Sequence, residues 1–138
     1  MRVVLDSSTL VSAFLSPTGT PAVLLSRAAE GAFSLCISAE ILTEVTRALA
    51  RERTTARYGY VAEEVERFVT MLVGAAELVS VLPDVPAVSR DPTDDVIIET
   101  AVVAKADHLV TGDNDLLTIG EHQGVRIVTP RQFLDELL

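Results

Sequence analysis

Several features that mark familiar protein classes are missing from this sequence. It contains no tryptophan, a single cysteine, Cys36, and a single lysine, Lys105. One cysteine cannot form an internal disulfide, so we expect a reduced, cytoplasmic protein. No apolar run approaches the ~20 residues that span a bilayer, so no membrane association is expected. The first residues, MRVVLDSS, lead directly into a strand and a turn, which is unlike a signal peptide.

Several catalytic signatures are missing as well. The sequence lacks the glycine-rich phosphate loops GxGxxG and GxxxxGK[ST], and it lacks the GxSxG turn of serine hydrolases. Its two histidines, His108 and His122, are isolated, and no cysteine–histidine cluster exists for zinc. Cys36 lies inside the apolar run FSLCIS, which favours an inert buried thiol. Nucleotide-dependent, zinc-dependent and nucleophilic-triad chemistry are therefore not expected.

The composition is that of a folded, acidic protein. The 138 residues are 49% hydrophobic and 22% charged, so we expect one globular domain spanning residues 1–138. The net charge of −9, taken alone, argues against a nucleic-acid partner. Bound metal would neutralise several of the acids, however, and the basic residues are unevenly spread along the chain. A basic protein partner would also explain the acidity.

Strand and helix patterns alternate from end to end. Short apolar runs predict strands at 2–5, 33–38, 77–82, 108–111 and 125–128, and amphipathic patterns predict helices between and after them. The polar segment 51–60 predicts a connection or a frayed helix end. Such alternation is typical of an α/β protein with a central parallel sheet of about five strands, right-handed crossovers and helices on both faces.

Two acidic residues follow strands of this predicted sheet. Asp6 comes directly after VVL, and Asp113 comes after HLVTG. Ligands of such folds bind beyond the carboxyl ends of the strands, so both side chains should reach one crevice. Either acid could instead be only a turn former or a helix cap. The matched pair favours a functional site, and Asp113 is preferred to Asp115 because it is nearer the strand end.

A third group of acids opens the helix predicted at 93–104. In the segment DPTDD, Asp91 fits the N-cap position and Pro92 the first helical turn. The acids could simply complement the helix dipole, but three of them in five residues exceed what capping needs. We therefore assign Asp94 to a metal and leave the role of Asp95 open.

A fourth acid lies on the helix predicted at 39–50. Glu44 flanks the apolar stripe of this helix, so its carboxylate should be half-buried. Spacing alone also allows an ordinary boundary residue that reaches solvent or pairs with a nearby arginine. Glu40, one turn earlier, is an equal candidate by spacing.

Carboxylates gathered in this way repel one another unless a cation joins them. Oxygen ligands favour Mg²⁺ or Mn²⁺ over zinc or copper. A metal held by carboxylates can orient a water molecule, lower its pKa and stabilise the transition state of phosphodiester hydrolysis. The sequence therefore predicts a metal-dependent enzyme that acts on phosphodiesters.

Arginines are concentrated in one part of the chain. Arg47, Arg51, Arg53 and Arg57 lie on or just after the helix that carries Glu44, with two tyrosines beyond them. These side chains could border the acidic site and hold a phosphate backbone. They could equally form a solvated helix end whose cations suit the helix dipole.

Three segments resemble the PIN-domain family. VVLDSSTLVSAF resembles the family's opening strand, acid and helix, and SAEILTEVTRAL is similar to its second acidic helix. The segment DPTDDVIIETAVVAKADHLVTGDNDLL is the most specific, because it combines an acid at a helix start with a TGD-x-DL loop. The resemblance covers nearly the whole chain and is greatest toward the VapC-like toxin endoribonucleases of bacterial toxin–antitoxin pairs.

This resemblance implies a compact α/β/α sandwich, Mg²⁺ or Mn²⁺, cleavage of RNA, a homodimer and a small antitoxin partner. Its catalytic and metal-binding acids correspond to Asp6, Glu44, Asp94 and Asp113, with Asp115 as an accessory ligand. Ser8 stands where many relatives have Asn, and Asp95 stands where this subgroup often has Asn. Neither departure removes a core acid, so we expect activity.

Two other functional classes fit parts of the pattern. A catalytically silent PIN-like binding module would keep both the fold and the acids. A receiver-type signalling domain also uses strand-end aspartates and Mg²⁺, but it needs an aspartate after a middle strand and a lysine after a late one. Here Ser38 and Pro83 follow the middle strands, and Lys105 precedes a strand, which argues against a receiver.

The hydropathy of the chain predicts self-association. The mean hydropathy is +0.37, which is high for a small monomer that must cover its apolar helix faces. We expect a homodimer held through apolar helix surface that includes Leu24, Leu25, Phe68 and Leu72.

Overall fold

The computed structural model describes residues 1–138 and contains one six-stranded sheet with the strand order β3-β2-β1-β4-β6-β5. The strands are β1 (Arg2–Leu5), β2 (Ser34–Ser38), β3 (Glu77–Val79), β4 (His108–Val110), β5 (Glu121–His122) and β6 (Val125–Val128). All neighbours pair in parallel except β5, which is antiparallel to β6. The predicted α/β class with a mostly parallel sheet is confirmed.

Eight helices lie between the strands or follow the last one. They are α1 (Ser7–Leu15), α2 (Thr20–Ala29), α3 (Ala39–Leu49), α4 (Glu52–Tyr58), α5 (Ala62–Ala75), α6 (Pro92–Val103), α7 (Asn114–Ile119) and α8 (Pro130–Leu137). None of them alone is long and apolar enough to cross a membrane; α1 and α2 together meet the length and composition but are bent by 98°.

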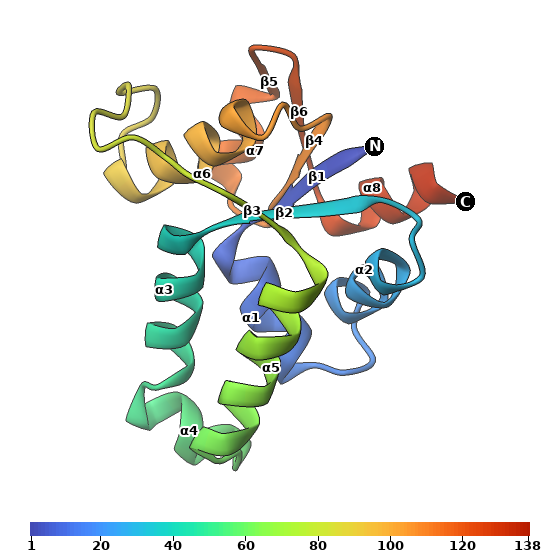
Figure 1. The fold of residues 1–138 in the computed structure, drawn as a ribbon, viewed down its shortest axis with the longest axis vertical. Helices are drawn as coiled ribbons and strands as arrows, with labels where there is room; N and C mark the ends of the chain where they lie inside the picture. The colour runs from blue at the N-terminus through green and yellow to red at the C-terminus, as the bar shows by residue number, and fades with distance from the viewer.

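The helices form layers on both faces of the sheet (Figure 1). One face is covered by α6, which contacts β1, β2 and β4, and by α7, which contacts β6. The other face is covered by α1, α3 and α5, which follow one another in contact. This three-layer arrangement places every β-to-α turn of the parallel strands at one edge of the sheet, the carboxyl edge.

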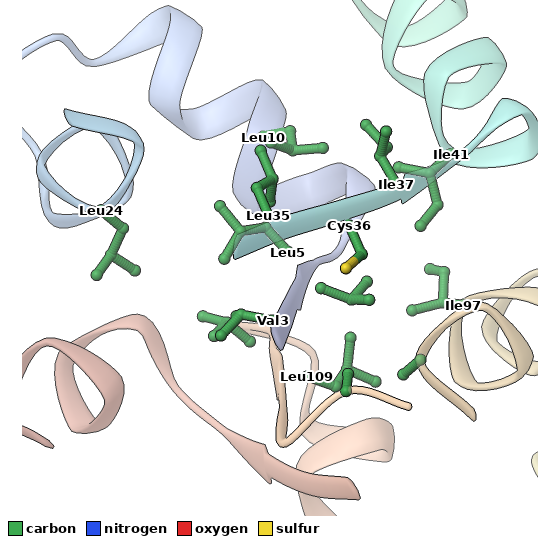
Figure 2. Close-up of a cluster of buried hydrophobic side chains, with 14 of the residues drawn as sticks. Val3, Leu5, Leu10, Leu24, Leu35, Cys36, Ile37, Ile41, Ile97 and Leu109 are labelled. Carbon is green, nitrogen blue, oxygen red and sulfur yellow. The ribbon is translucent and has the colours of Figure 1, made fainter. Parts of the chain in front are cut away.

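The core fills the space on both sides of the central strands. Alternate residues of a strand point to opposite faces, so Leu35 and Ile37 project toward α1 while Cys36 projects to the other face, where Ile97 of α6 lies (Figure 2). Cys36 is fully buried, and burial raises the pKa of its thiol. This agrees with an inert side chain in the core.

Side chains cap the first turns of several helices, among them the predicted cap Asp91. Ser38 caps α3, Asp91 caps α6, and Thr129 forms a capping box with Gln132 at the start of α8. α2 begins without such a cap, because its N-cap residue is Gly19 and makes no side-chain hydrogen bond.

The structure differs from the sequence-based assignment at four short elements. β3 ends at Val79 rather than residue 82, because Val79 pairs with Ser38, the last residue of β2, and no partner lies beyond it. The polar segment 51–60 contains α4, and α7 follows Asp113. The hairpin that forms β5 turns through Gln123 and Gly124, which both adopt positive φ as a two-residue turn requires.

The residues that the sequence places on an apolar dimer surface are buried or partly buried within the chain. Leu24 and Leu72 are both 0% exposed, and Leu25 and Phe68 are partly buried against the core. Their helix faces are covered within the chain, since α2 packs on α1 and α8, and α5 packs on α3. Among the large apolar side chains that do face solvent are Met71 and Val73 on α5 and Leu78 and Leu82 after it.

Candidate metal centre

The acidic residues that follow β1 and β4 lie beside each other because these strands are direct neighbours. Leu5 of β1 is in register with Val110 of β4. The pairing continues one residue further, where the backbone N–H of Asp6 donates to the carbonyl of Val110 at 3.1 Å. The expected convergence at the carboxyl edge of the sheet thus comes from backbone pairing.

Asp6 is a buried carboxylate, 2% exposed, that caps α1. Its Oδ1 accepts hydrogen bonds from the backbone N–H of Thr9 at 2.8 Å and from the hydroxyl of Ser8 at 3.1 Å. Its Oδ2 accepts from the hydroxyl of Thr111. Both oxygens of Asp6 are thus held by donors of the chain itself, and Asp6, although predicted to bind metal, is not one of the three carboxylates that come together at this edge.

Thr111 connects the two strand ends and was not recognised as a site residue from the sequence. Its fully buried hydroxyl donates to Asp6 and accepts from the backbone N–H of Asp113 at 3.0 Å. One hydroxyl therefore holds the loop after β4 against the residue after β1. The available signal was its position, a hydroxyl residue at the end of a strand and two residues before an acid.

Three carboxylates form the acidic cluster, which comprises Asp94, Asp113 and Asp115. Each can offer an oxygen such that all three atoms lie within 4.8 Å of one another. Asp94 comes from the first turn of α6, Asp113 caps α7, and Asp115 lies in the first turn of α7. Their exposure increases in that order, from a buried to a half-buried to an exposed residue.

The carboxylates of the acidic cluster repel one another. Burial, together with the neighbouring Asp113 carboxylate, raises the pKa of Asp94 to about 7. Asp91 and Asp115 add to the repulsion. No arginine, lysine or histidine lies within the 4.0 Å of an ion pair from any of these acids. The protein itself therefore supplies no counter-charge in contact with them.

Asp91 and Asp95, which flank Asp94 in sequence, have structural roles. Asp91 accepts a hydrogen bond from the backbone N–H of Thr93 at 2.9 Å and caps α6. Asp95 is buried and its Oδ1 accepts from the backbone N–H groups of Ser89 and Val88, at 2.7 and 3.0 Å. These hydrogen bonds hold the pKa of Asp95 below its usual range. Asp95 thus anchors the preceding loop and is not a member of the acidic cluster.

Glu44 lies in a neighbouring cleft and outside the acidic cluster. The cleft has a volume of about 440 Å³ and runs between α3 and the start of α6. Glu40, Glu44 and Arg47 line one side of it, and Pro92 and Thr93, next to Asp94, line the other. Glu44 is half-buried, as its spacing predicts, whereas Glu40 is exposed. Glu44 forms no ion pair with Arg47.

The four arginines of the predicted cluster are divided between two places. Arg47 lines the cleft beside Glu44. Arg51 is the N-cap of α4, and Arg53 and Arg57 are within it. α4 lies at the end of α3 that points away from α6 and α7 (Figure 1). Of the four, only Arg47 lines the cleft that neighbours the acidic cluster.

The donor set fits a hard divalent cation. Oxygen atoms bound to Mg²⁺ at ~2.1 Å lie at most ~4.2 Å apart, so small side-chain movements would bring the three acidic-cluster oxygens into coordination. The absence of nitrogen or sulfur donors among them disfavours zinc and copper. The protein is therefore of the α/β/α class, with a carboxylate cluster at the starts of α6 and α7 that is suited to metal-assisted chemistry.

Comparison with known families identifies the chain more closely. Its residues 2–115 match the family model described as the PIN domain. This stretch covers most of the chain, including Asp6, Glu44 and the whole acidic cluster, so the protein belongs to the PIN-domain family. No functionally curated protein matched the sequence.

Solved structures share the fold at low sequence identity. The chain is similar to a chain in the crystal structure of VapBC2 from Rickettsia felis bound to a DNA fragment from their promoter, with a TM-score of 0.65 and 14% identity over 94% of this chain and 98% of the other. It is also similar to PAE2754 from Pyrobaculum aerophilum, with a TM-score of 0.61 and 16% identity over 99% and 89% of the two chains. These similarities establish the architecture.

Proposed function

We propose that the protein is a metal-dependent endoribonuclease that hydrolyses RNA phosphodiesters with Mg²⁺ or Mn²⁺. The observation that carries the proposal is the acidic cluster of Asp94, Asp113 and Asp115 at the carboxyl edge of the sheet, with no protein cation in contact with it. Membership of the PIN-domain family supports the same chemistry.

The residues of the site would have different roles according to their position. Asp94, Asp113 and Asp115 would hold the metal, and Asp6 would border it through the Thr111 hydroxyl. The bound metal would supply an activated water and stabilise charge on the phosphoryl group. Glu44, which lies across the cleft on α3, would orient the water or the phosphate. Its half-buried carboxylate has no basic partner in the chain and is free for that role.

The partner is proposed to be a small antitoxin protein. The support comes from the similarity to a chain of VapBC2, which was crystallised with a DNA fragment from its promoter. The net charge of −9 fits a basic binding segment on the partner. Co-purification with the product of an adjacent small reading frame would support this pairing, and the absence of a complex between the two purified proteins would count against it.

We also propose a homodimer, formed through the exposed apolar side chains of α5 and the segment after it rather than through Leu24 and Leu72. Met71, Val73, Leu78 and Leu82 are between 42% and 75% exposed. Light scattering at micromolar concentration should give twice the mass of 14.8 kDa. A Met71→Asp, Leu78→Asp variant should be monomeric, and a monomeric wild-type protein would contradict the proposal.

The activity is tested by metal removal and restoration. Wild-type protein stripped with a chelator should leave single-stranded RNA intact, and added Mg²⁺ or Mn²⁺ should restore internal cleavage, whereas Ca²⁺ should restore little. A catalytically silent binding module would bind RNA or the antitoxin without cleaving RNA under any metal condition. That result, obtained with correctly folded protein, would reject the endoribonuclease function and favour a catalytically silent binding module.

A further inference from the structure

The loop that leads into α6 lies against α7 and forms a second hollow beside the acidic cluster. The hollow has a volume of about 350 Å³. Val88, Ser89 and Arg90 line it from the loop, and Asp115, Thr118 and Ile119 line it from α7. Since Asp115 belongs to the acidic cluster, this hollow borders the cluster on the α7 side. On the α3 side, the Glu44 cleft reaches Pro92 and Thr93, which precede Asp94.

The loop is held in place on both sides of Arg90. Before it, the backbone N–H groups of Val88 and Ser89 donate to Asp95 Oδ1, which also lies 2.9 Å from the Ser89 hydroxyl. After it, the backbone N–H of Asp91 donates to the Ser89 hydroxyl oxygen at 3.2 Å, and Asp91 itself caps α6. The backbone of Arg90 is therefore fixed by hydrogen bonds to a buried carboxylate of α6.

The Arg90 guanidinium has no ion-pair partner in the protein. Its side chain is exposed, and no carboxylate lies within the 4.0 Å of an ion pair, although Asp115 lines the same hollow. Arg47 is in the same condition at the cleft on the other side. A guanidinium offers a planar fork of donors that matches two oxygens of one phosphate. Two arginines without an ion-pair partner therefore line the two hollows, Arg47 from α3 and Arg90 from the loop before α6.

We propose that Arg90 is a substrate-binding residue that holds a backbone phosphate of the RNA next to the one being cleaved, opposite the phosphate held by Arg47. The proposal rests on the endoribonuclease function above. Asp95 is a positioning residue that acts through the loop, because its hydrogen bonds fix the backbone from which Arg90 extends. The strand would cross the acidic cluster between α3 and α7, and its contacts with both arginines would be independent of base sequence.

The test measures RNA binding separately from cleavage. Asp94→Asn, which removes cleavage, serves as the background, and binding of a short fluorescent single-stranded RNA is followed by anisotropy at several salt concentrations. Adding Arg90→Ala should weaken binding by roughly three- to tenfold and lower the salt slope by about 1, because one phosphate contact is lost. Arg27→Ala, at the exposed end of α2 away from the acidic cluster, is the matched control and should bind as the background does.

Asp95 is tested by its coupling to Arg90. Asp95→Asn alone should weaken RNA binding by a smaller factor, and the double variant Arg90→Ala, Asp95→Asn should bind no more weakly than Arg90→Ala. Circular dichroism and thermal unfolding check that each variant folds. Additive losses would show that Asp95 does not act through Arg90 and would overturn its positioning role.

The outcomes separate this proposal from the function on which it rests. If wild-type protein cleaves RNA with metal but Arg90→Ala leaves affinity and salt slope unchanged, the role of Arg90 is wrong and the endoribonuclease stands. If wild-type protein neither binds nor cleaves RNA, the proposed function fails and this inference fails with it. A loss of affinity in Arg27→Ala equal to that in Arg90→Ala would also overturn it, because the effect would be one of net charge.

Discussion

The amino edge of the sheet, where β1, β3 and β4 begin, differs from the carboxyl edge in how its charges are arranged. At the amino edge, the Arg2 guanidinium pairs with Glu77 and donates to the carbonyl of Ala104 at 2.6 Å, and the Arg2 backbone N–H donates to Asp107 at 2.9 Å. Basic and acidic groups from several elements are thus brought together, and the protein neutralises its own charges there.

The last helix extends this pattern at the amino edge. Glu136 of α8 lies with one oxygen 2.8 Å from Nε2 of the buried His108 and with the other 3.1 Å from the Arg126 guanidinium. At the carboxyl edge, the acidic cluster and Asp6 receive hydrogen bonds from neutral donors alone. The comparison shows that acids at the amino edge are paired with basic groups of the chain, whereas the acids at the carboxyl edge have no basic partner in the chain.

The largest effect should follow from removing one charge at the carboxyl edge. Asp94→Asn keeps the shape of the side chain but removes a carboxylate that would hold the metal, so cleavage should fall by about 10³-fold or more. Asp6→Asn should act in the same direction. The measurement is the initial rate of RNA cleavage at saturating Mn²⁺, with Asp135→Asn on the exposed side of α8 as the matched control. Full activity in Asp94→Asn would reject the metal assignment.

The second effect concerns pH and metal affinity. Since the pKa of Asp94 is raised to about 7, metal must displace a proton from this residue below that pH. The apparent affinity for Mn²⁺ should therefore decrease by up to about tenfold for each unit of pH below 7 and level off above it. Titration calorimetry between pH 5.5 and 8.5 measures this, and uptake of protons on metal binding would contradict it.

The third effect is on the stability of the metal-free protein. A carboxyl whose pKa is raised on folding stabilises the fold at low pH, where it is protonated, and this contribution is lost as pH rises through about 7. Metal-free wild-type protein should therefore be less stable at pH 8 than Asp94→Asn by about 1–3 kcal/mol, or about 3–10 °C in Tm. The difference should decrease as pH falls from 7 toward 4, where the carboxyl is protonated in the unfolded chain as well. Equal melting temperatures at pH 8 would show that the carboxylates do not repel one another.

The smallest effect is expected at the amino edge. Glu136→Gln removes the charge that lies between His108 and Arg126, which should lower stability by about 0.5–1.5 kcal/mol. Metal affinity and RNA cleavage should be unchanged, because the substitution lies at the opposite edge of the sheet from the acidic cluster. Thermal unfolding measures the change in stability, and the RNA cleavage rate tests whether activity is unchanged. A loss of cleavage without a loss of stability would show that the amino edge also contributes to the activity.

Much of the carboxyl edge follows from the sequence because strand order and direction leave few choices. Apolar runs followed by an acid predict where Asp6 and Asp113 emerge, and the DPTDD segment predicts a capped helix start with Asp94 inside it. The roles of Thr111 and Asp95 could not be predicted from the sequence. Their hydrogen bonds depend on how a loop folds back onto a strand or a helix, and no local pattern in the sequence encodes that direction.

The surface was the least predictable part. Helical periodicity identified the apolar faces of α2 and α5, but it could not say that α8 and α3 would cover them. Leu24 and Leu72 are therefore core residues. The predicted arginine cluster is divided for a similar reason, because sequence periodicity does not give the direction of the chain after a helix. The chain turns into α4 after Ala50, and α4 places Arg53 and Arg57 away from the acidic cluster.

The Thr111 hydroxyl also has a consequence for how the protein is made. It joins Asp6 to a residue 105 positions later in the chain, and Asp94 reaches the same edge from α6 between them. A ribosome must synthesise β4 and the loop after it before these groups can meet, and long-range contacts of this kind form late in folding. A nascent or truncated chain that ends before β4 therefore holds no complete acidic cluster. The acidic cluster can therefore form only after the chain has been synthesised at least as far as Asp115.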